Sequence, residues 1–191
     1  MFRLATDFIE NTGTAVYLTG KAGTGKTTFL RQVVEKQLKK TVVLAPTGVA
    51  AINAGGVTIH SFFGLPTKMF MPIEEHVDPN MGNSKPMLAR HFHYNSEKLQ
   101  LMRSMELLII DEISMVRADL LDAVDFALRF ARNSAKPFGG VQLLMIGDMY
   151  QLPPVLRNEE KGLMMKYYAS EFFFDAKAFV ELDPVLIELD H

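Results

Sequence analysis

The chain has 191 residues, enough for one domain with its own core, and its 48% hydrophobic and 22% charged residues are typical of a globular protein. Its formal net charge of −2 gives no overall attraction for nucleic acid, so any such contact must be local. The chain has no cysteine, which excludes disulfides and thiolate metal sites, and it shows neither a signal peptide nor a long apolar segment, so we expect a soluble, cytoplasmic protein without a membrane partner.

The chain begins with a short helix followed by a strand, a loop and a second helix. Residues 2–9 repeat apolar side chains at helical spacing, which predicts an amphipathic helix packed on the domain. Residues 14–19 (TAVYLT) are typical of a strand, and residues 27–39 predict a helix with lysines gathered at its C-terminal end. A strand, a loop and a helix in this order are the setting that a phosphate-binding loop requires.

The loop at residues 20–28 (GKAGTGKTT) fits the phosphate-loop pattern GxxxxGK[ST]. Gly23 and Gly25 lack a Cβ, so the backbone can turn sharply and direct successive N–H groups toward a phosphate chain. Lys26 supplies positive charge for the outer phosphates, Thr27 offers a hydroxyl to Mg²⁺, and the helix that follows adds a partial positive charge. The predicted nucleotide-binding residues are Gly20, Ala22, Gly23, Thr24, Gly25, Lys26, Thr27 and Thr28.

The next strand is a short apolar run at residues 41–45 (TVVLA), as expected of a buried parallel strand. Pro46, Thr47 and Gly48 end it, and a segment of small residues leads to residues 58–64 (TIHSFFG).

Residues 65–95 contain four prolines and no helical or strand period, so we expect a long loop or a small inserted element. The balance of charge turns basic over residues 85–103, where Phe92 and Tyr94 lie among the charges. Such a composition can grip a phosphate backbone and stack a base, and it equally fits an ordinary solvated insertion. Both interpretations stay open from the sequence.

Two adjacent carboxylates, Asp111 and Glu112, directly follow the apolar run at residues 105–110 (MELLII). The carboxyl edge of an open α/β sheet is where ligands bind. Since side chains alternate along a strand, we expect the two acids to point in different directions and to take different roles. Asp111 can hold Mg²⁺, while Glu112 can orient and deprotonate an attacking water.

The second half of the chain continues the alternation of helices and strands. Residues 117–132 predict a helix with an apolar inner face, an ion pair between Asp125 and Arg129, and charges on a solvated face. Two glycines then lead into a strand at residues 141–146 (VQLLMI), which ends in a polar cluster, and a last strand follows at residues 185–189. Strands that alternate with helices predict a parallel sheet flanked by helices.

Four separated signatures together resemble the first motor domain of the petite-integration-frequency DNA helicases, enzymes of superfamily one that move 5′ to 3′ on single strands. They are residues 20–28, residues 45–64 (APTGVAA with TIHSFFG), residues 109–116 (IIDEISMV) and residues 146–155 (IGDMYQLPPV). The resemblance covers essentially the whole chain. It implies a P-loop NTPase fold of the RecA-like type, with a parallel sheet in three α/β/α layers.

The resemblance also implies roles for individual residues. Lys26 would neutralise phosphate charge, Thr27 and Asp111 would hold the Mg²⁺ that accompanies ATP, and Glu112 would be the catalytic base. Gln151 would sense the γ-phosphate and couple it to the DNA side. The residues that would touch the single strand are Pro46, Thr47, Gly48, Thr58 and His60.

The implied activity is ATP-dependent translocation on single-stranded DNA and unwinding of duplexes and forks by a monomeric protein. Residues 65–95 lie near the place where the family carries a strand-separating element. The resemblance further implies work in DNA repair, DNA recombination or telomere maintenance.

The sequence departs from the family pattern in two respects. The glutamine that reads adenine upstream of the phosphate loop is missing, because the first glutamine is Gln32. The family also needs a second RecA-like domain with an arginine finger, and no such domain follows within the 191 residues. We therefore expect the chain, which ends in LIELDH, to be part of a longer protein and to be nearly inactive by itself, since a missing arginine finger costs about 10³- to 10⁵-fold in rate.

Two further functions fit the motifs. A RecD-like or relaxase-linked P-loop motor shares nearly all of them. A nucleotide-gated nucleic-acid-binding module that never unwinds DNA would need the same phosphate loop. A nucleotide kinase is disfavoured, because the paired acids and the GDxxQ cluster would have no role there.

Overall fold

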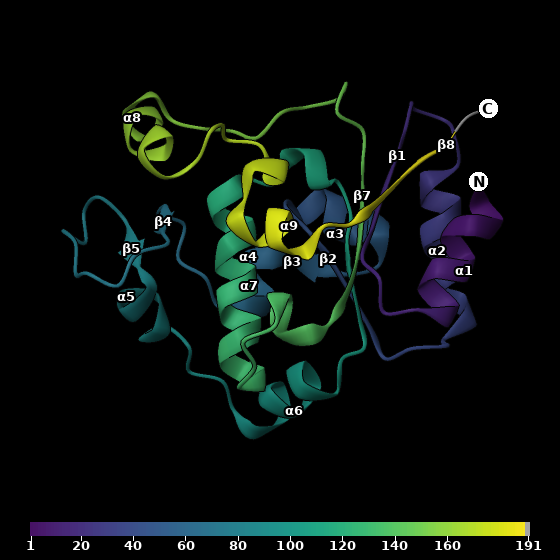
Figure 1. The fold of residues 1–191 in the computed structure, drawn as a ribbon, viewed down its shortest axis with the longest axis horizontal. Coiled ribbons are helices and arrows are strands. Elements are labelled where there is room, and N and C mark those ends of the chain that lie inside the picture. The colour runs from purple at the N-terminus through teal and green to yellow at the C-terminus, as the bar shows by residue number, and fades with distance from the viewer. Residues whose placement is uncertain (190–191) are drawn as a thin grey trace.

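The computed structural model describes residues 1–189 and is built around a parallel sheet (Figure 1). Its six strands lie in the order β3-β2-β6-β7-β1-β8, and every neighbouring pair is parallel. The strands are β1 (Val16–Gly20), β2 (Thr41–Ala45), β3 (Val57–Thr58), β6 (Leu107–Ile110), β7 (Gln142–Gly147) and β8 (Val185–Leu189). β6 and β7 are buried throughout, as expected of central strands in a parallel sheet with helices on both faces. Asp190 and His191, the end of the LIELDH segment, lie outside the described residues.

Helices cover both faces of this sheet, which confirms the predicted three-layer α/β fold (Figure 1). One face carries α1 (Phe2–Asn11), α2 (Lys26–Lys36) and α3 (Gly48–Ala54). The other carries α4 (Ile59–Phe63), α6 (Ser96–Ser104), α7 (Ala118–Arg132) and α9 (Lys177–Leu182), and α8 (Asn158–Tyr167) lies beyond its upper end. Short 3₁₀ turns occur at Ile113–Met115, Pro137–Gly140 and Phe173–Asp175. Across residues 1–189, no helix combines the length and the apolar character needed to cross a membrane.

The predicted C-terminal end of α2 is wrong by about one turn. The helix ends at Lys36, because Gln37 adopts a left-handed backbone conformation with φ of 48°. The ammonium group of Lys39 donates hydrogen bonds to the carbonyl of Thr12 at 2.8 Å and to Oε1 of Gln142 at 2.6 Å. This lysine therefore links the segments of Thr12 and Gln142, and it lies beyond the C-terminal end of α2.

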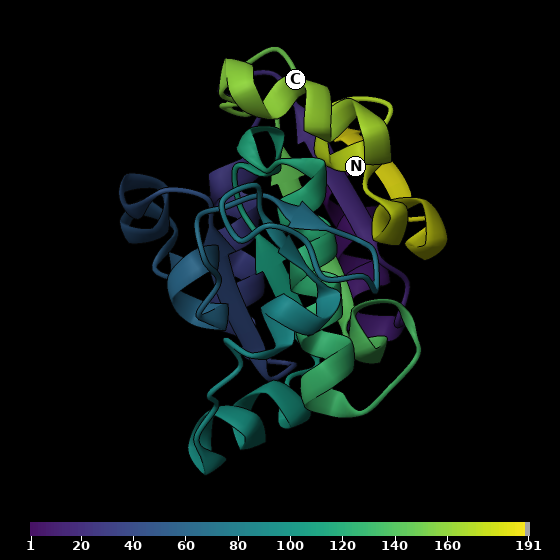
Figure 2. The same ribbon diagram turned by 90° about the vertical axis from the view of Figure 1, so that its left-hand side faces the viewer.

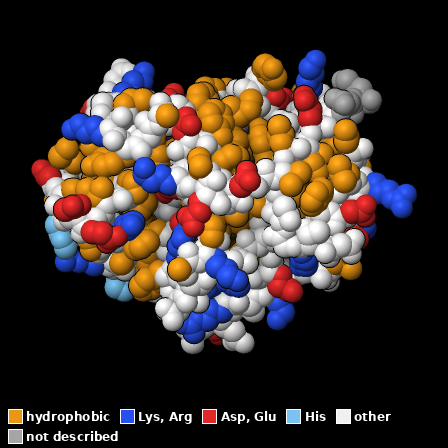
Figure 3. Space-filling view, viewed as in Figure 1, with side chains coloured by type: hydrophobic (Ala, Val, Ile, Leu, Met, Phe, Trp, Pro, Cys, Tyr) orange, Lys and Arg blue, Asp and Glu red, His pale blue; other side chains and the backbone are white. Residues whose placement is uncertain are grey.

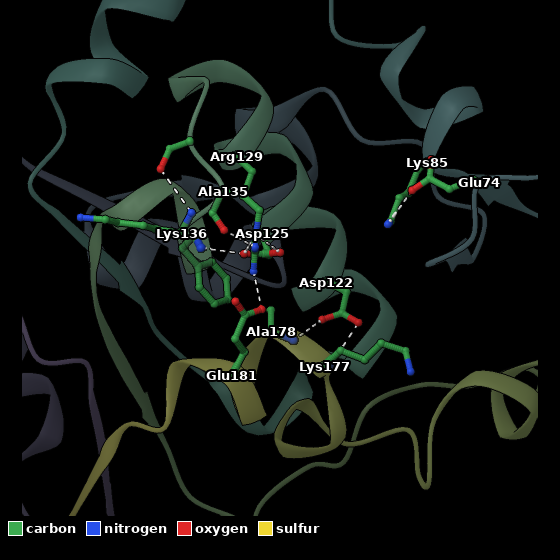
Figure 4. Close-up of polar contacts among 12 residues, drawn as sticks. Glu74, Lys85, Asp122, Asp125, Arg129, Ala135, Lys136, Lys177, Ala178 and Glu181 are labelled. Atoms are coloured by element: carbon green, nitrogen blue, oxygen red, sulfur yellow. Dashed lines mark hydrogen bonds and ion pairs between the residues drawn. The ribbon is translucent and has the colours of Figure 1, made fainter.

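The prediction that the charges of α7 form a solvated face is wrong for its acids (Figure 4). Asp122 and Asp125 are buried, and each accepts hydrogen bonds from the backbone of a different segment. Asp122 accepts the N–H of Ala178 at 2.9 Å, and Asp125 accepts the N–H of Phe138 at 2.6 Å while also pairing with Arg129, as predicted. Burial raises the pKa of both carboxyls, and these hydrogen bonds partly offset it. The acids of α7 thus hold neighbouring loops in place.

The segment at residues 65–95 forms a small ordered element on the outer side of α7 (Figure 2). It contains a parallel pair of two-residue strands, β4 (Phe70–Met71) and β5 (Asn83–Ser84), followed by α5 (Lys85–Ala89). The insertion therefore extends the α7 side of the domain by a further thin layer.

Phe92 and Tyr94, which could have offered a surface for base stacking, are used in packing. Their rings stack on each other with centroids 5.3 Å apart, and Phe92 also packs on Phe126 and is 8% exposed. The hydroxyl of Tyr94 donates a hydrogen bond to the carbonyl of Phe63 at 2.8 Å. Packing is therefore the interpretation that fits these two aromatic residues.

Basic and acidic side chains are interspersed over the face drawn in Figure 3, in keeping with the near-zero net charge.

Candidate nucleotide-binding and catalytic site

The loop between β1 and α2 has the backbone shape that its glycines permit. Gly23 and Gly25 have φ of 82° and 91°, a region that residues with a Cβ rarely adopt. The side chain of Lys26 folds back over the loop, and its ammonium group donates hydrogen bonds to the carbonyls of Gly20 and, at 3.0 Å, of Lys21. A positive charge is thereby held against the loop at the N-terminal end of α2, where anions bind favourably.

The threonines of this loop divide into one supporting and two exposed residues. Thr24 is buried, and its hydroxyl donates a hydrogen bond to the carbonyl of Lys21 at 2.9 Å, which closes the loop internally. Thr27 and Thr28 are exposed in the first turn of α2. The hydroxyl of Thr27 is thus available to a ligand, as the pattern predicts.

The parallel register brings the ends of three strands to one edge beside this loop. Thr19 of β1 pairs with Gly147 of β7, and Ile110 of β6 pairs with Met145 of β7. The polar residues that follow these strands must therefore lie side by side at the carboxyl edge. Burial raises the pKa of both Asp111 and Glu112, and the positive charge of Lys26 partly offsets this rise.

The two acids differ in backbone conformation. Asp111 follows β6 directly, and its Oδ1 accepts the N–H of Glu112 at 3.0 Å. Glu112 has φ of 52° and ψ of 44°, an uncommon left-handed conformation for a residue with a side chain. Both acids lie beyond β6, so a backbone turn at Glu112, and not strand alternation, sets the direction of its side chain. That the two acids take different roles stays a prediction.

Burial is the main cause of the pKa shifts of both carboxyls. It raises the pKa of Asp111, and it raises the pKa of Glu112, to which the negative charges of Asp111 and Asp148 also contribute. A half-buried carboxylate with a raised pKa holds a proton more strongly than a free one, so it is better suited to take one from water.

Asp148 organises the loop after β7. This buried carboxylate accepts the N–H of Tyr150 at 3.0 Å and, through its other oxygen, Nε2 of Gln151 at 3.2 Å. Gln151 itself is exposed, so its amide is held at the edge of the sheet by a buried acid. Gly147, at the start of this loop, lies against Ile113 and Ser114, so the loop that carries Gln151 begins beside the turn that follows the paired acids.

Only three of the five residues predicted to contact single-stranded DNA line the same pocket. Pro46, Thr47 and His60 line one pocket of about 270 Å³ between the carboxyl edge and the inserted element. Thr47 and Thr58 also cap helices, since their hydroxyls accept the N–H groups of Ala50 and Ser61, both at 3.2 Å. Gly48 and Thr58 are not among the lining residues, although both lie in the segments that lead to the pocket.

An ion network centred on Arg117 was not predicted. Its guanidinium forms two parallel hydrogen bonds with the carboxylate of Asp119, at 2.8 and 2.9 Å, and a third with Glu160 of α8 at 3.1 Å. Asp119 in turn accepts the N–H of Phe70 in the inserted element at 3.0 Å. The network therefore joins the segment after the paired acids to both α8 and the insertion. In the sequence, the local signal for this ion pair is an arginine two residues before an aspartate at the start of a predicted helix.

Replacing Arg117 with methionine is expected to lower the free energy of unfolding by about 3–5 kcal/mol, because it leaves the buried carboxylate of Asp119 without its charge partner. Chemical denaturation followed by circular dichroism measures this change. Glu159→Gln is the control, since it breaks an exposed ion pair with Arg157 at 3.9 Å and should change stability by less than about 0.5 kcal/mol. Equal stability of the Arg117→Met variant and the wild type would contradict the role given to this network.

A glycine loop between a parallel strand and a helix, with paired acids at the end of a nearby strand, defines a P-loop nucleoside triphosphatase. Thr27 and Asp111 supply the hydroxyl and carboxylate oxygens that Mg²⁺ prefers, so the residues present fit this ion. A family model described as PIF1-like helicase matches residues 2–182. The chain belongs to the PIF1-like helicase family.

Individual relatives agree with this membership. The ATP-dependent DNA helicase PIF7 of Trypanosoma brucei brucei is 34% identical over 186 residues, which covers 97% of this chain and 17% of that protein. Pif1 helicase from Bacteroides in complex with ADP-AlF3 and single-stranded DNA superposes with a TM-score of 0.87 at 43% identity, over 100% of this chain and 41% of that one. Pif1 helicases solved at forked double-stranded DNA give a TM-score of 0.86 at 43% identity, over 98% of this chain and 42% of that one. The chain therefore spans only part of the relatives that it matches.

Proposed function

We propose that this chain is the first RecA-like motor domain of an ATP-dependent DNA helicase that moves 5′ to 3′ on single strands. The observation that carries the proposal is the convergence, at one edge of the sheet, of the phosphate loop, the paired acids after β6 and the Asp148–Gln151 loop after β7. A plain nucleotide-binding fold needs the first of these alone. The combination supports ATP hydrolysis in which Gln151 senses the γ-phosphate.

The phosphate loop of this domain binds the triphosphate of ATP. Its N–H groups and the ammonium of Lys26 stabilise the phosphate oxygens, and the N-terminal end of α2 adds to this attraction. Mg²⁺, held by the Thr27 hydroxyl and the Asp111 carboxylate, neutralises charge on the phosphates when it is bound. Glu112 orients the attacking water and accepts its proton, and Gln151 contacts the γ-phosphate from the loop that Asp148 holds.

The polynucleotide lies on the side of the pocket formed by Pro46, Thr47 and His60. The single-stranded and forked DNA present with the Bacteroides and fork-bound Pif1 helicases supports such a substrate for this chain. A second RecA-like domain, joined to this one in a longer polypeptide, supplies the arginine finger and the other half of the DNA track. The inserted element at residues 65–95 lines the same pocket, which supports a role for it as a strand-separating element.

Measurement of ATP hydrolysis with and without a single-stranded oligonucleotide tests the proposal, for the 191-residue chain and for the longer polypeptide that contains it. We expect strong stimulation by DNA in the longer polypeptide and near silence in the isolated chain, because the missing arginine costs about 10³- to 10⁵-fold. Nucleotide binding without any response to DNA in the longer polypeptide would contradict a motor and favour a nucleotide-gated module. Rapid turnover by the isolated chain would contradict the need for a second domain.

A further inference from the structure

The loop that carries Gln151 is held at its two ends and is exposed between them. It runs from the end of β7 to α8 (Figure 1). Tyr150 and Leu152 are 91% and 67% exposed, and of residues 150–157 only Pro154 is buried. Because little of this loop packs against the domain, the position of Gln151 depends on how the two ends are fixed.

The near end of the loop is attached to the turn that follows the paired acids. Gly147, where β7 ends, lies against Ile113 and Ser114 of that turn. The carboxylate of Asp148 then accepts a hydrogen bond from Nε2 of Gln151 at 3.2 Å. This end is therefore built onto the segment that carries the paired acids.

Glu160, in the first turn of α8, attaches the far end of the loop to the same segment. Its Oε2 accepts hydrogen bonds from the N–H of Arg157 at 3.2 Å and from Nη1 of Arg117 at 3.1 Å. Arg117 is itself fixed by two parallel hydrogen bonds to Asp119, at 2.8 and 2.9 Å. The side chains of Arg117 and Glu160 are 15% and 18% exposed, so salt screens their ion pair only weakly. The pair therefore holds the end of the loop at a fixed point shortly after the turn.

Between its two ends the loop borders the pocket of about 270 Å³, which Val155 lines from the loop and Met115 from the turn. Pro153 and Pro154 stiffen the segment between Gln151 and the far end, since a proline ring fixes φ near about −65°. A stiff segment that borders a pocket passes a displacement of its far end on to Gln151.

We infer that Glu160 is a positioning residue for ATP hydrolysis: by pairing with Arg117, it holds the loop so that the amide of Gln151 faces the γ-phosphate. The inference rests on the proposed function, which gives Gln151 its role at the phosphate. Glu160 touches neither nucleotide nor metal, and its effect passes through Gln151. Misplacing a catalytic group by about 1 Å costs on the order of 100-fold in rate, so an ion pair outside the site can have a large effect.

The experiment measures kcat and KM for ATP with saturating single-stranded oligodeoxythymidylate, in the longer polypeptide that joins this chain to a second RecA-like domain. We expect Glu160→Ala to lower kcat by about 10- to 100-fold and to change KM for ATP by less than about twofold, because the phosphate loop is intact. Glu159→Ala is the matched control. It removes the neighbouring carboxylate from the same turn of α8, whose pair with Arg157 is exposed and 3.9 Å long, and it should keep the wild-type kcat.

A double substitution tests the path of the effect. In a Gln151→Ala background, Glu160→Ala should lower kcat no further, because the residue through which Glu160 acts is already removed. The same fold-loss with and without Gln151 would show that Glu160 acts through general stability and would overturn the inference alone. A wild-type kcat for folded Glu160→Ala would do the same.

Two other outcomes concern the proposed function. A wild-type kcat for Gln151→Ala by itself, or no ATP hydrolysis by the longer polypeptide, would overturn the proposed function and the inference with it. Thermal unfolding shows which variants fold. If Glu160→Ala does not fold, Glu160→Gln replaces it, because the amide keeps an oxygen for the N–H of Arg157 and loses only the charge that pairs with Arg117.

Discussion

Replacing Lys26 with alanine is expected to reduce ATP hydrolysis by about 10²- to 10³-fold in the polypeptide that joins this chain to a second RecA-like domain. The ammonium of Lys26 is held over the phosphate loop by the carbonyls of Gly20 and Lys21, so its loss removes charge stabilisation from the reacting phosphates. The fold should persist, because these hydrogen bonds join residues within a single loop. Phosphate release measures the rate, and thermal unfolding measures the fold.

Lys21→Ala is the matched control for this prediction. Lys21 lies in the same loop, its side chain is exposed, and its contact with Lys26 is made by the backbone carbonyl, which alanine retains. The control should hydrolyse ATP at nearly the wild-type rate. If Lys26→Ala and Lys21→Ala have the same rate, the assignment of the phosphate loop is wrong.

Replacing Glu112 with glutamine is expected to lower hydrolysis by about 10²- to 10⁴-fold while nucleotide still binds. The amide keeps the size of the side chain but cannot accept the proton of the attacking water. In the wild type, the rate should rise with pH through the raised pKa of Glu112, because only the ionised form acts as the base. Hydrolysis across a pH series and calorimetric titration with a non-hydrolysable ATP analogue measure the two effects.

The same substitution has a distinctive effect on stability. Because the pKa of Glu112 is higher in the folded than in the unfolded chain, ionised Glu112 destabilises the fold at neutral pH, and this penalty disappears below the pKa of the unfolded state. Glu112→Gln should therefore raise the melting temperature at pH 7 and leave it unchanged at low pH. A variant that lost activity together with stability at pH 7 would point to a structural role instead of a catalytic one.

The sequence by itself determined the sheet, the phosphate loop and the order of the motifs. These features rest on local signals, since an apolar run of about five residues predicts a buried strand wherever it lies, and Gly23 and Gly25 permit a backbone shape that few other residues adopt. The family resemblance then supplied the predicted roles of residues such as Gln151, which no local pattern specifies. The exact end of α2 and the turn at Glu112 were missed, because a single left-handed residue leaves no periodic signal.

Only the tertiary structure decided which charged residues are buried and what they hold. Asp122 and Asp125 resemble a solvated helix face, yet they accept N–H groups from residues 56 and 13 positions further along the chain. Asp119 likewise reaches back 49 positions to Phe70, and the pocket of about 270 Å³ draws its walls from four separate segments. Burying a carboxylate costs free energy unless a hydrogen-bond donor lies next to it in the folded chain. Which residue supplies that donor depends on how distant segments of the domain pack together.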